Sequence, residues 1–418
     1  MSKCKRVLLI GGNYSPELTG IGKYNGEMID MLARQGFQCS VITSFPYYPH
    51  WKVQEPYTKN ARWFKKELNV VEGVPATIQP VEIFRCPHYI PGKPTGLKRM
   101  ISDFSFCFSA FIKIVQFLFK PKYDFVIVVA PPFPLGLLGV LYQKIKGARL
   151  LYHIQDLQID AARDFNLIKS AFIINLLLKV EKYILKRADV VSSISQGMIK
   201  KIKAKHPREV VFFPNWIDTS LFFPIPESEQ LKVDFGFNVS DKIVLYSGAI
   251  GEKQGLEAIL ECAKKLEHNA NLKFVICGSG PYKEKLEQMK QAQQLDNVVF
   301  LPLQPYDKLN FFLNMADIHL VLQKANAADL VMPSKLTAIL SVGGLAIITA
   351  NKNSSLFDVV DAYKMGVLVE PENQSALVAA IDNLVNNYGR DTNMNARLYA
   401  EEYLSIEQVF RKFVLQLS

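Results

Sequence analysis

Cysteine is scarce in this chain, with six residues among 418. They are Cys4, Cys39, Cys86, Cys107, Cys262 and Cys277, and no two of them form a C-x-x-C pair. They stand in apolar or strand-like segments, as reduced structural thiols do. The pattern argues against a disulfide framework of the kind found in small secreted domains and against a cysteine-based zinc site.

A long apolar run is also missing near the N-terminus. Residues 1–6 are mostly polar, and the apolar run Val7–Ile10 gives way to Gly11 and Gly12. This run is too short for the core of a signal peptide and far too short to span a bilayer. We therefore expect a buried first strand and a cytoplasmic protein.

Positive charge is concentrated in the first half of the chain. Residues 1–215 carry 31 Lys and Arg against 15 Asp and Glu, a net of +16, and the remainder has a net of −6, which gives +10 in all. A basic half favours an anionic membrane surface, a phosphorylated substrate or nucleic acid as partner. Zinc-finger spacing, RNP-like aromatic motifs and a recognition helix are absent, so we expect no nucleic acid.

Residues 97–122 are rich in phenylalanine and carry lysines and an arginine at their ends. A helix here could lie in the membrane interface, with its cations near lipid phosphates. Asp103, Lys113 and Gln116 interrupt the apolar run and argue against a span. The alternative is a helix buried against the strand expected at 125–130, and the two interpretations can overlap.

Strand-like runs alternate with helix-length segments along the whole chain, which predicts an α/β fold with parallel sheets. The expected strands are 6–10, 38–43, 82–86, 125–130, 149–154, 190–194 and 210–213, then 242–247, 272–277, 298–301, 318–321, 345–349 and 366–369. A proline-bearing stretch at 215–239 separates the two series. We expect two doubly wound Rossmann-like domains facing across a cleft: 1–215 with a C-terminal helix of about 394–418, and 216–393.

Ligands of such sheets bind at the carboxyl ends of the strands. The first loop places Gly20 and Gly22 where a helix is expected to begin, so that backbone N–H groups could meet an anion. The spacing is not G-x-G-x-x-G, and no acidic residue ends the second strand, which argues against a nicotinamide dinucleotide. A tight turn without a ligand is the alternative.

A polar cluster, His153 to Asp156, ends the strand expected at 149–154. His153 could hydrogen-bond a substrate hydroxyl, orient a second substrate or act as a general base. The alternative is a histidine that is simply satisfied in the core.

The second half repeats the order of strand, glycine loop and helix at 245–255. Lys253 on this loop, after Gly248, could supply positive charge to a diphosphate leaving group beside helix-end N–H donors. Gly278, Gly280 and Pro281 end the next strand in a shape that admits a base or ribose. The alternative for Lys253 is a solvated surface lysine.

Two further strand ends complete the set. The backbone of the loop that holds Leu303 could hydrogen-bond the edge of a nucleobase. Ser334 and Lys335 stand at the expected start of a helix, which is another anion site, and Asp329 before them could accept sugar hydroxyls.

In these segments the chain resembles the retaining GT-B glycosyltransferases of family 4 over essentially its whole length, and within them the WcaI-type enzymes of colanic acid biosynthesis. The matching segments are Y-S-P-E-L-T-G-I-G at 14–22, H-I-Q-D at 153–156, P-N-W-I-D at 214–218, the loop at 248–255, L-P-L-Q-P at 301–305 and A-A-D-L-V-M-P-S-K-L at 327–336.

The resemblance implies a GDP- or UDP-sugar donor held by the second domain, a lipid-linked saccharide acceptor held by the first, retention of configuration and no metal cofactor. It implies catalytic roles for His153, Asp156 and Lys253 and acceptor contacts from Tyr14, Glu17 and Gln155. Donor contacts would come from Gly20, Gly22, Gly248, Lys253, Gly278, Gly280, Pro281, Leu303, Asp329, Ser334 and Lys335. The basic first half and residues 97–122, together with this resemblance, predict peripheral attachment to the anionic cytoplasmic face of the inner membrane.

The chain departs from the family pattern at two places. The glutamates of the E-x7-E motif fall on Leu330 and Ala338, so a ribose-binding carboxylate is missing and Asp329 is the candidate replacement. Ala249 and Gln254 stand where relatives carry arginine and lysine. Two alternatives therefore stay open, a nucleotide-sugar 2-epimerase and a catalytically silent sugar-nucleotide-binding subunit.

Overall fold

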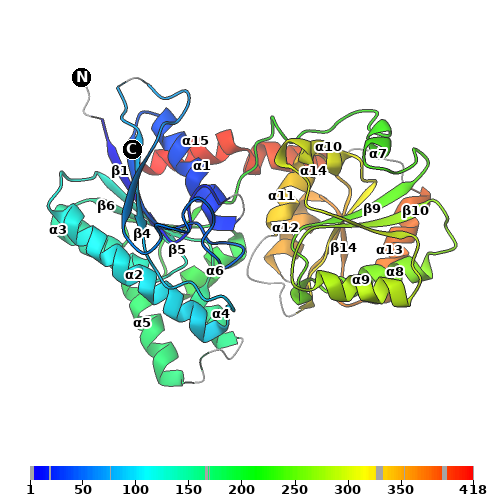
Figure 1. The fold of residues 1–418 in the computed structure, drawn as a ribbon, viewed down its shortest axis with the longest axis horizontal. Coiled ribbons are helices and arrows are strands. Elements are labelled where there is room, and N and C mark those ends of the chain that lie inside the picture. Colours follow the sequence, from blue (N-terminus) through cyan, green and yellow to red (C-terminus); the bar gives the residue numbers. More distant parts are fainter. Residues whose placement is uncertain are drawn as a thin grey trace. The chain divides into compact units, whose positions relative to one another are not determined.

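The computed structural model divides the chain into two compact units (Figure 1). Unit 1 comprises Met1–Phe213 with Phe413–Ser418, and unit 2 comprises Pro214–Lys412. The structure describes residues 4–17, 20–75, 77–164, 168, 170–325, 333–352, 354–387 and 393–417. Each unit is an α/β layer structure built on one sheet, as the alternation of strands and helices predicts.

Unit 1 contains an eight-stranded sheet in the order β3-β4-β2-β1-β5-β6-β7-β8. The strands are β1 (Arg6–Gly11), β2 (Gln38–Ser44), β3 (Lys65–Asn69), β4 (Val81–Cys86), β5 (Phe125–Ala130), β6 (Arg149–Ile154), β7 (Val190–Ser193) and β8 (Val211–Phe212). All pairings in this sheet are parallel except that of β3 with β4. The strand order changes direction between β1 and β5, and ligands bind at such a switch point in open α/β sheets.

The sequence pattern does not predict β3. Its residues, K-K-E-L-N, are mostly charged or polar, and none of them is buried. An edge strand needs no apolar alternation, because one of its sides faces water. What holds it is its pairing with β4, in which Lys66 lies opposite Phe84 and Glu67 opposite Ile83.

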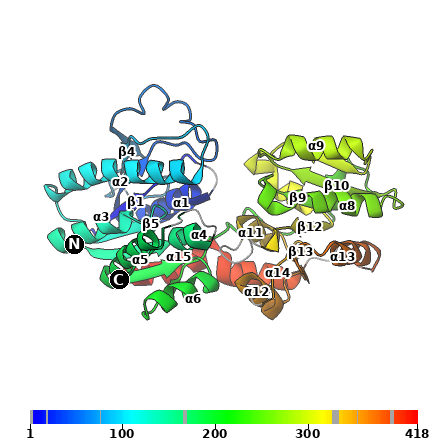
Figure 2. The same cartoon turned by 90° about the horizontal axis from the view of Figure 1, so that it is seen from below.

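Helices cover both faces of this sheet. They are α1 (Gly20–Arg34), α2 (Gly96–Leu118), α3 (Leu135–Lys146), α4 (Gln158–Asp164), α5 (Ala171–Arg187) and α6 (Gln196–Lys205). Residues of α2, α3, α5 and α6 share one apolar core with alternate residues of the central strands, such as Leu8, Val128 and Tyr152. The long helix α2 crosses unit 1 in both views (Figure 1, Figure 2).

The phenylalanine-rich segment has both of the expected environments. One face of α2 is buried and includes Phe106, Ala110, Ile114 and Phe117. The opposite face exposes five large apolar side chains, Leu97, Ile101, Phe104, Phe108 and Phe111, which are 41% to 70% exposed. We call these five residues the apolar ridge.

Unit 2 contains a six-stranded parallel sheet in the order β11-β10-β9-β12-β13-β14. The strands are β9 (Lys242–Ser247), β10 (Leu272–Cys277), β11 (Val298–Leu301), β12 (Ile318–Val321), β13 (Ala346–Thr349) and β14 (Val367–Val369). All six occur where the sequence predicts them, because parallel strands buried on both faces read as continuous runs of apolar residues. The switch in strand order lies at β9.

Two layers of helices enclose the sheet of unit 2 (Figure 1). The helices α8 (Glu257–Lys265), α9 (Lys283–Ala292) and α13 (Gln374–Asn387) share a core on one face. On the other face lie α10 (Leu309–Asn314), α11 (Ser334–Ser341), α12 (Ser355–Tyr363) and α14 (Met394–Tyr399). A short helix, α7 (Gln230–Asp234), contacts α10.

The C-terminal segment differs from the single helix expected at 394–418. It consists of α14, a π-helical turn at Ala400–Leu404 and α15 (Ile406–Val414), with a break at Ser405. Residues up to Lys412 belong to unit 2, and those from Phe413 onward belong to unit 1. The reason is that Ala396, Tyr399, Ala400 and Leu404 are buried in the core of unit 2.

Arg85 of β4 fastens the loops at the carboxyl edge of the unit 1 sheet. Its guanidinium donates from Nη2 to the Ser15 carbonyl oxygen at 2.6 Å, from Nη1 to that of Ser44 at 3.3 Å, and from Nε to Glu67 Oε2 at 2.9 Å. Arg85 is 2% exposed, so these contacts lie largely out of water. One buried cation thereby ties the first loop, the end of β2 and the edge strand β3 to β4.

We predict that Arg85→Met lowers the free energy of unfolding by about 3–5 kcal/mol, because Glu67 and two carbonyl groups lose a buried partner. Lys66→Met is the matched control, since the ion pair of Lys66 with Glu82 is largely exposed and should contribute under about 1 kcal/mol. Urea unfolding followed by circular dichroism measures both. Equal losses in the two variants would contradict the role given to Arg85.

Candidate functional site

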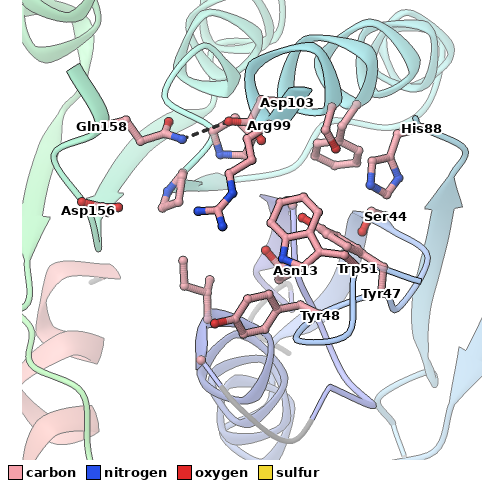
Figure 3. A pocket seen from close by; sticks show the side chains of 17 residues that line it. Asn13, Ser44, Tyr47, Tyr48, Trp51, His88, Arg99, Asp103, Asp156 and Gln158 are labelled. Carbon is pink, nitrogen blue, oxygen red and sulfur yellow. Dashed lines mark hydrogen bonds between the residues drawn. The ribbon is translucent and has the colours of Figure 1, made fainter. Parts of the chain in front are cut away.

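A cavity of about 300 Å³ opens at the carboxyl edge of the unit 1 sheet (Figure 3). It lies at the switch point, because its lining includes residues that follow β1, β5 and β6. The lining residues are Gly12, Asn13, Gly20, Ile21, Ser44, Tyr47, Tyr48, Trp51, His88, Arg99, Ser102, Asp103, Phe106, Pro131, Pro132, Asp156 and Gln158. Of the sequence-predicted site residues, Gly20 and Asp156 therefore line it directly.

Glu17 hydrogen-bonds three residues that line this cavity. Its Oε1 accepts hydrogen bonds from the backbone N–H groups of Tyr47 at 2.9 Å and Tyr48 at 2.8 Å, and its Oε2 accepts from Asn13 Nδ2 at 2.9 Å. The side chain is buried, which raises the pKa of its carboxyl group. Glu17 thus holds the loop that carries the aromatic wall, and any part it has in acceptor binding is positional.

Gly22 is required by the same contact. A Cβ atom at this position would lie 2.6 Å from Glu17 Oε2 and 2.7 Å from Glu17 Cβ. From its place at the start of a helix, Gly22 is predicted to lie at an anion site. In the structure, a glycine is needed at this position because α1 approaches the Glu17 side chain closely.

Tyr14, Gln155 and His153 are buried, and none of them is among the residues that line the unit 1 cavity. Burial raises the pKa of Tyr14 well above its usual range. The His153 Nδ1 atom lies 2.9 Å from Ser192 Oγ, its ring packs edge-on against Phe213, and burial lowers its pKa to about 3. His153 is therefore neutral and enclosed in the structure, and its catalytic role stays a prediction.

The strand-end loops of unit 2 are bound to one another through their glycines. The N–H of Gly248 donates to the Cys277 carbonyl oxygen at 2.9 Å. A Cβ atom on Gly278 would lie 1.9 Å from the Gly248 carbonyl oxygen, and one on Gly280 would lie 2.1 Å from that of Ile250. Only glycine allows this approach, which brings the loops after β9 and β10 together as the sequence predicts.

Lys335 lies against this glycine pair. It is the second residue of α11, and its ammonium nitrogen lies 3.8 Å from the centroid of the Tyr246 ring. A Cβ atom on Gly248 would be 3.2 Å from the same nitrogen. Among the residues that the structure describes, this buried nitrogen has no hydrogen-bond partner, and burial lowers the pKa of Lys335 to about 7.

The other predicted donor residues lie on the same edge but at the surface. Lys253 is exposed on a 3-10 turn, and its carbonyl oxygen accepts from Lys324 N–H at 3.1 Å. Leu303, Pro281 and Ser334 are also exposed. Asp329 lies outside the described residues, so its place as the missing carboxylate stays a prediction.

The structure adds pocket residues that sequence reasoning missed. Trp51 and His88 follow β2 and β4, and Arg99 and Asp103 stand one turn apart near the start of α2. The aromatic run Y-Y-P-H-W at 47–51 was a usable signal, because it follows a predicted strand. Arg99 and Asp103 gave no such signal, since they belong to a segment that was interpreted only by its apolar residues.

Among the described residues, no group of three or more His, Cys, Asp and Glu is arranged to hold a metal ion. One helix among them, α2, is long and apolar enough to cross a membrane by length and composition, a test that core helices of soluble proteins also pass.

The chain matches known proteins along almost its full length. Residues 19–216 match the family model described as glycosyl transferase 4-like domain, and residues 227–402 match glycosyl transferases group 1. The chain is 41% identical, over 98% of both chains, to the Escherichia coli (strain K12) protein WcaI, which is described as a colanic acid biosynthesis glycosyl transferase.

Solved structures share the fold. Sucrose-phosphate synthase from Thermosynechococcus elongatus superposes with a TM-score of 0.74 at 16% identity over 99% of both chains. Anabaena HepE in complex with UDP gives a TM-score of 0.69 at 14% identity over 99% of both chains. The chain has two Rossmann-like units of the GT-B type, and it matches both family models and a relative along its length. It therefore belongs to the glycosyltransferases that combine a glycosyl transferase 4-like domain with a group 1 domain.

Proposed function

We propose that this protein transfers a sugar, with retention of configuration, from a GDP- or UDP-sugar to a lipid-linked saccharide in the assembly of an exopolysaccharide of the colanic acid type. The similarity to WcaI along the whole chain supports the pathway. The UDP complex of HepE, a protein of the same fold, supports a nucleotide-sugar donor.

The observation that carries the proposal is the buried ammonium group of Lys335. Lys335 has no counter-ion among the residues that the structure describes, and burial of a cation without one is costly, which is consistent with its lowered pKa. A diphosphate is the ligand that would supply the missing negative charge. Gly248 leaves open the space beside the Lys335 nitrogen, and the first N–H groups of α11 are further donors for an anion.

The same arrangement suggests what unit 2 does in the reaction. As the bond between the sugar and the diphosphate breaks, negative charge builds up on the departing phosphate. Lys335 would neutralise that charge, with the exposed Lys253 of the same edge as a second cation. In this proposal the protein's own cations do the work that a bound metal does in other transferases. Asp156, which lines the unit 1 cavity, would contact the acceptor.

We also propose peripheral attachment of unit 1 to the cytoplasmic face of the inner membrane. The apolar ridge of α2 is exposed, as are Phe172 and Leu176 of α5, which covers the same face of the sheet. Exposed lysines of α5, Lys179 and Lys182 among them, would meet anionic headgroups. Buried apolar area and electrostatic attraction together are what interfacial helices need.

We predict that Lys335→Met lowers kcat/KM by about 100- to 1,000-fold, because a preorganised positive charge at the leaving group is lost. The measurement is nucleotide release from GDP-fucose or UDP-glucose with and without a lipid-linked acceptor. Lys253→Ala is the matched variant. Because Lys253 is exposed, its loss should be smaller, and a larger loss for Lys253→Ala would contradict the leading role of Lys335.

The low pKa of Lys335 predicts the pH dependence of donor binding. A diphosphate binds the protonated amine and raises its pKa from about 7, so affinity should be constant below pH 7 and fall by up to tenfold per unit above it. Nucleotide sugars are suitable probes, because their diphosphate diester does not titrate in this range. Calorimetry between pH 6 and 9 should show the fall in the wild type and a flat profile in Lys335→Met.

We predict that the double variant Phe104→Ser, Phe108→Ser binds anionic liposomes at least about tenfold more weakly than the wild type, because it removes apolar area from the ridge. Co-sedimentation at low and high salt measures the binding. Val239→Ser with Leu398→Ser in unit 2 is the control, since these side chains are about equally exposed, at 48% and 53%. Equal loss in both double variants, or no wild-type binding at low salt, would contradict attachment through α2.

A further inference from the structure

The unit 1 cavity contains a histidine, His88, whose ring nitrogens are unsatisfied by the residues that the structure describes. His88 lies between the rings of Tyr47 and Phe106, whose centroids are 4.9 Å and 6.0 Å from its own. Both His88 ring nitrogens are shielded from solvent, and neither has a hydrogen-bond partner among the described residues. Burial lowers the pKa of His88 to about 4, so the ring is neutral, with one nitrogen that donates and one that accepts. A ligand hydroxyl that reaches the ring from the cavity would satisfy one of them.

An aromatic surface and a cation lie on the same cavity (Figure 3). Trp51 adopts a left-handed backbone conformation with φ of +52°, which is rare for a bulky residue. The Arg99 guanidinium carbon lies 5.0 Å from the centroid of the Trp51 ring. Arg99 thus lies over one face of the indole, and a sugar ring would pack its C–H side against the part of Trp51 that lines the cavity. The guanidinium offers a fork of donors to a phosphate.

A carboxyl group completes the set one helical turn further along α2. Asp103 Oδ2 accepts a hydrogen bond from Gln158 Nε2 at 3.0 Å, and Gln158 Oε1 in turn accepts from Phe133 N–H at 2.8 Å. Gln158, which also lines the cavity, therefore holds the Asp103 carboxyl in one orientation. A carboxylate has two oxygens, and the other one could accept from a ligand hydroxyl.

We propose that this cavity binds a glycosyl phosphate, with one sugar ring of the acceptor on Trp51, its hydroxyls on His88 and Asp103, and its phosphate on Arg99. The proposal rests on the proposed function and names the acceptor subsite, which contains none of the residues predicted for acceptor binding from sequence.

The position of Arg99 favours a phosphate that belongs to a lipid. At 3.6 residues per turn, Arg99 and Asp103 lie on the face of α2 opposite the apolar ridge, which begins at Leu97. Lys93 and Lys98, both exposed, precede Arg99 in the sequence. Arg99 and Leu97 both belong to the first turn of α2, so a lipid chain attached to a phosphate on Arg99 could pass around the start of the helix onto the ridge.

The first test compares matched soluble probes by ligand-observed NMR. Glucose 1-phosphate should bind at least about tenfold more tightly than methyl glucoside, because a charge-assisted contact to Arg99 is added. Glucuronic acid and inorganic phosphate are the other probes. Equal binding of glucose 1-phosphate and methyl glucoside, or a preference for glucuronic acid, would overturn the proposal.

Variants assign the contacts. Arg99→Met should bring glucose 1-phosphate and methyl glucoside within about twofold of each other. Trp51→Leu should weaken both by about tenfold, whereas Trp51→Phe should keep most of the binding. Arg62→Met and Trp63→Leu are the controls, because both side chains are exposed and neither lines the cavity. A preference for glucose 1-phosphate that survives Arg99→Met would overturn the role of Arg99.

A third experiment, with a lipid-linked probe, distinguishes a phosphate that belongs to a lipid from that of a soluble sugar phosphate. Polyprenyl-diphosphate glucose in phosphatidylcholine vesicles should bind more tightly than glucose 1-phosphate, and Phe104→Ser with Phe108→Ser should remove that gain alone. Equal affinities would support the glycosyl-phosphate site but identify a soluble sugar phosphate as its ligand.

Donor binding separates this proposal from the proposed function. The melting temperature of each variant is measured with and without GDP-fucose and UDP-glucose, since a ligand of the folded state raises it. If the donors stabilise every variant but Arg99→Met and Trp51→Leu change nothing, the subsite is wrong and the function stands. If glucose 1-phosphate binds as expected but no nucleotide sugar does, the subsite stands and the function is wrong.

Discussion

Central parallel strands buried on both faces leave little place for chemistry except at their ends, and both units of this protein follow that constraint. Alternate residues of β1, β5 and β6 pack against helices on one face of the sheet, and the same holds for the central strands of unit 2. Polar side chains therefore gather where the strands stop and the loops begin. The unit 1 cavity and the Lys335 site are both of this kind.

The carboxyl edges of the two sheets each hold a buried cation, Arg85 in unit 1 and Lys335 in unit 2, and the two cations have different surroundings. Arg85 has a carboxylate and two carbonyl oxygens around its guanidinium, so its charge is compensated. Its role is to hold the loops at the carboxyl edge of the sheet in place. Lys335 has the ring of Tyr246 beside its ammonium nitrogen and no hydrogen-bond partner among the described residues, which is why we propose it as a binding site for an anion. A compensated cation stabilises the fold, whereas an uncompensated one lowers its own pKa and favours a ligand.

The helix α2 connects three properties of unit 1. One of its faces fills the core with Phe106, Ala110 and Phe117, and the start of that same face presents Arg99 and Asp103 to the cavity. The opposite face exposes the apolar ridge. A substrate with a sugar, a phosphate and a lipid tail could place its sugar near Asp103, its phosphate near Arg99 and its tail on the apolar ridge. Both proposals made for unit 1 therefore depend on α2.

The sequence by itself determined the class of fold and the family. Thirteen strands were predictable because buried parallel strands are short apolar runs, and glycine loops such as Gly248 to Gly255 mark their ends. The edge strand β3 was not predictable, because its residues are polar and only its pairing with β4 makes it a strand.

Only the tertiary structure decided which side chains meet. His153, Tyr14 and Gln155 are buried, and the Glu17 carboxylate accepts hydrogen bonds from the backbone N–H groups of Tyr47 and Tyr48. The tertiary structure brought Trp51 and Arg99, 48 positions apart in the chain, onto one cavity. It also placed Lys335 beside Gly248, a contact that depends on the packing of α11 against the end of β9. Local patterns specify where strands and helices begin, but the partners of a side chain depend on long-range packing, which no short segment encodes.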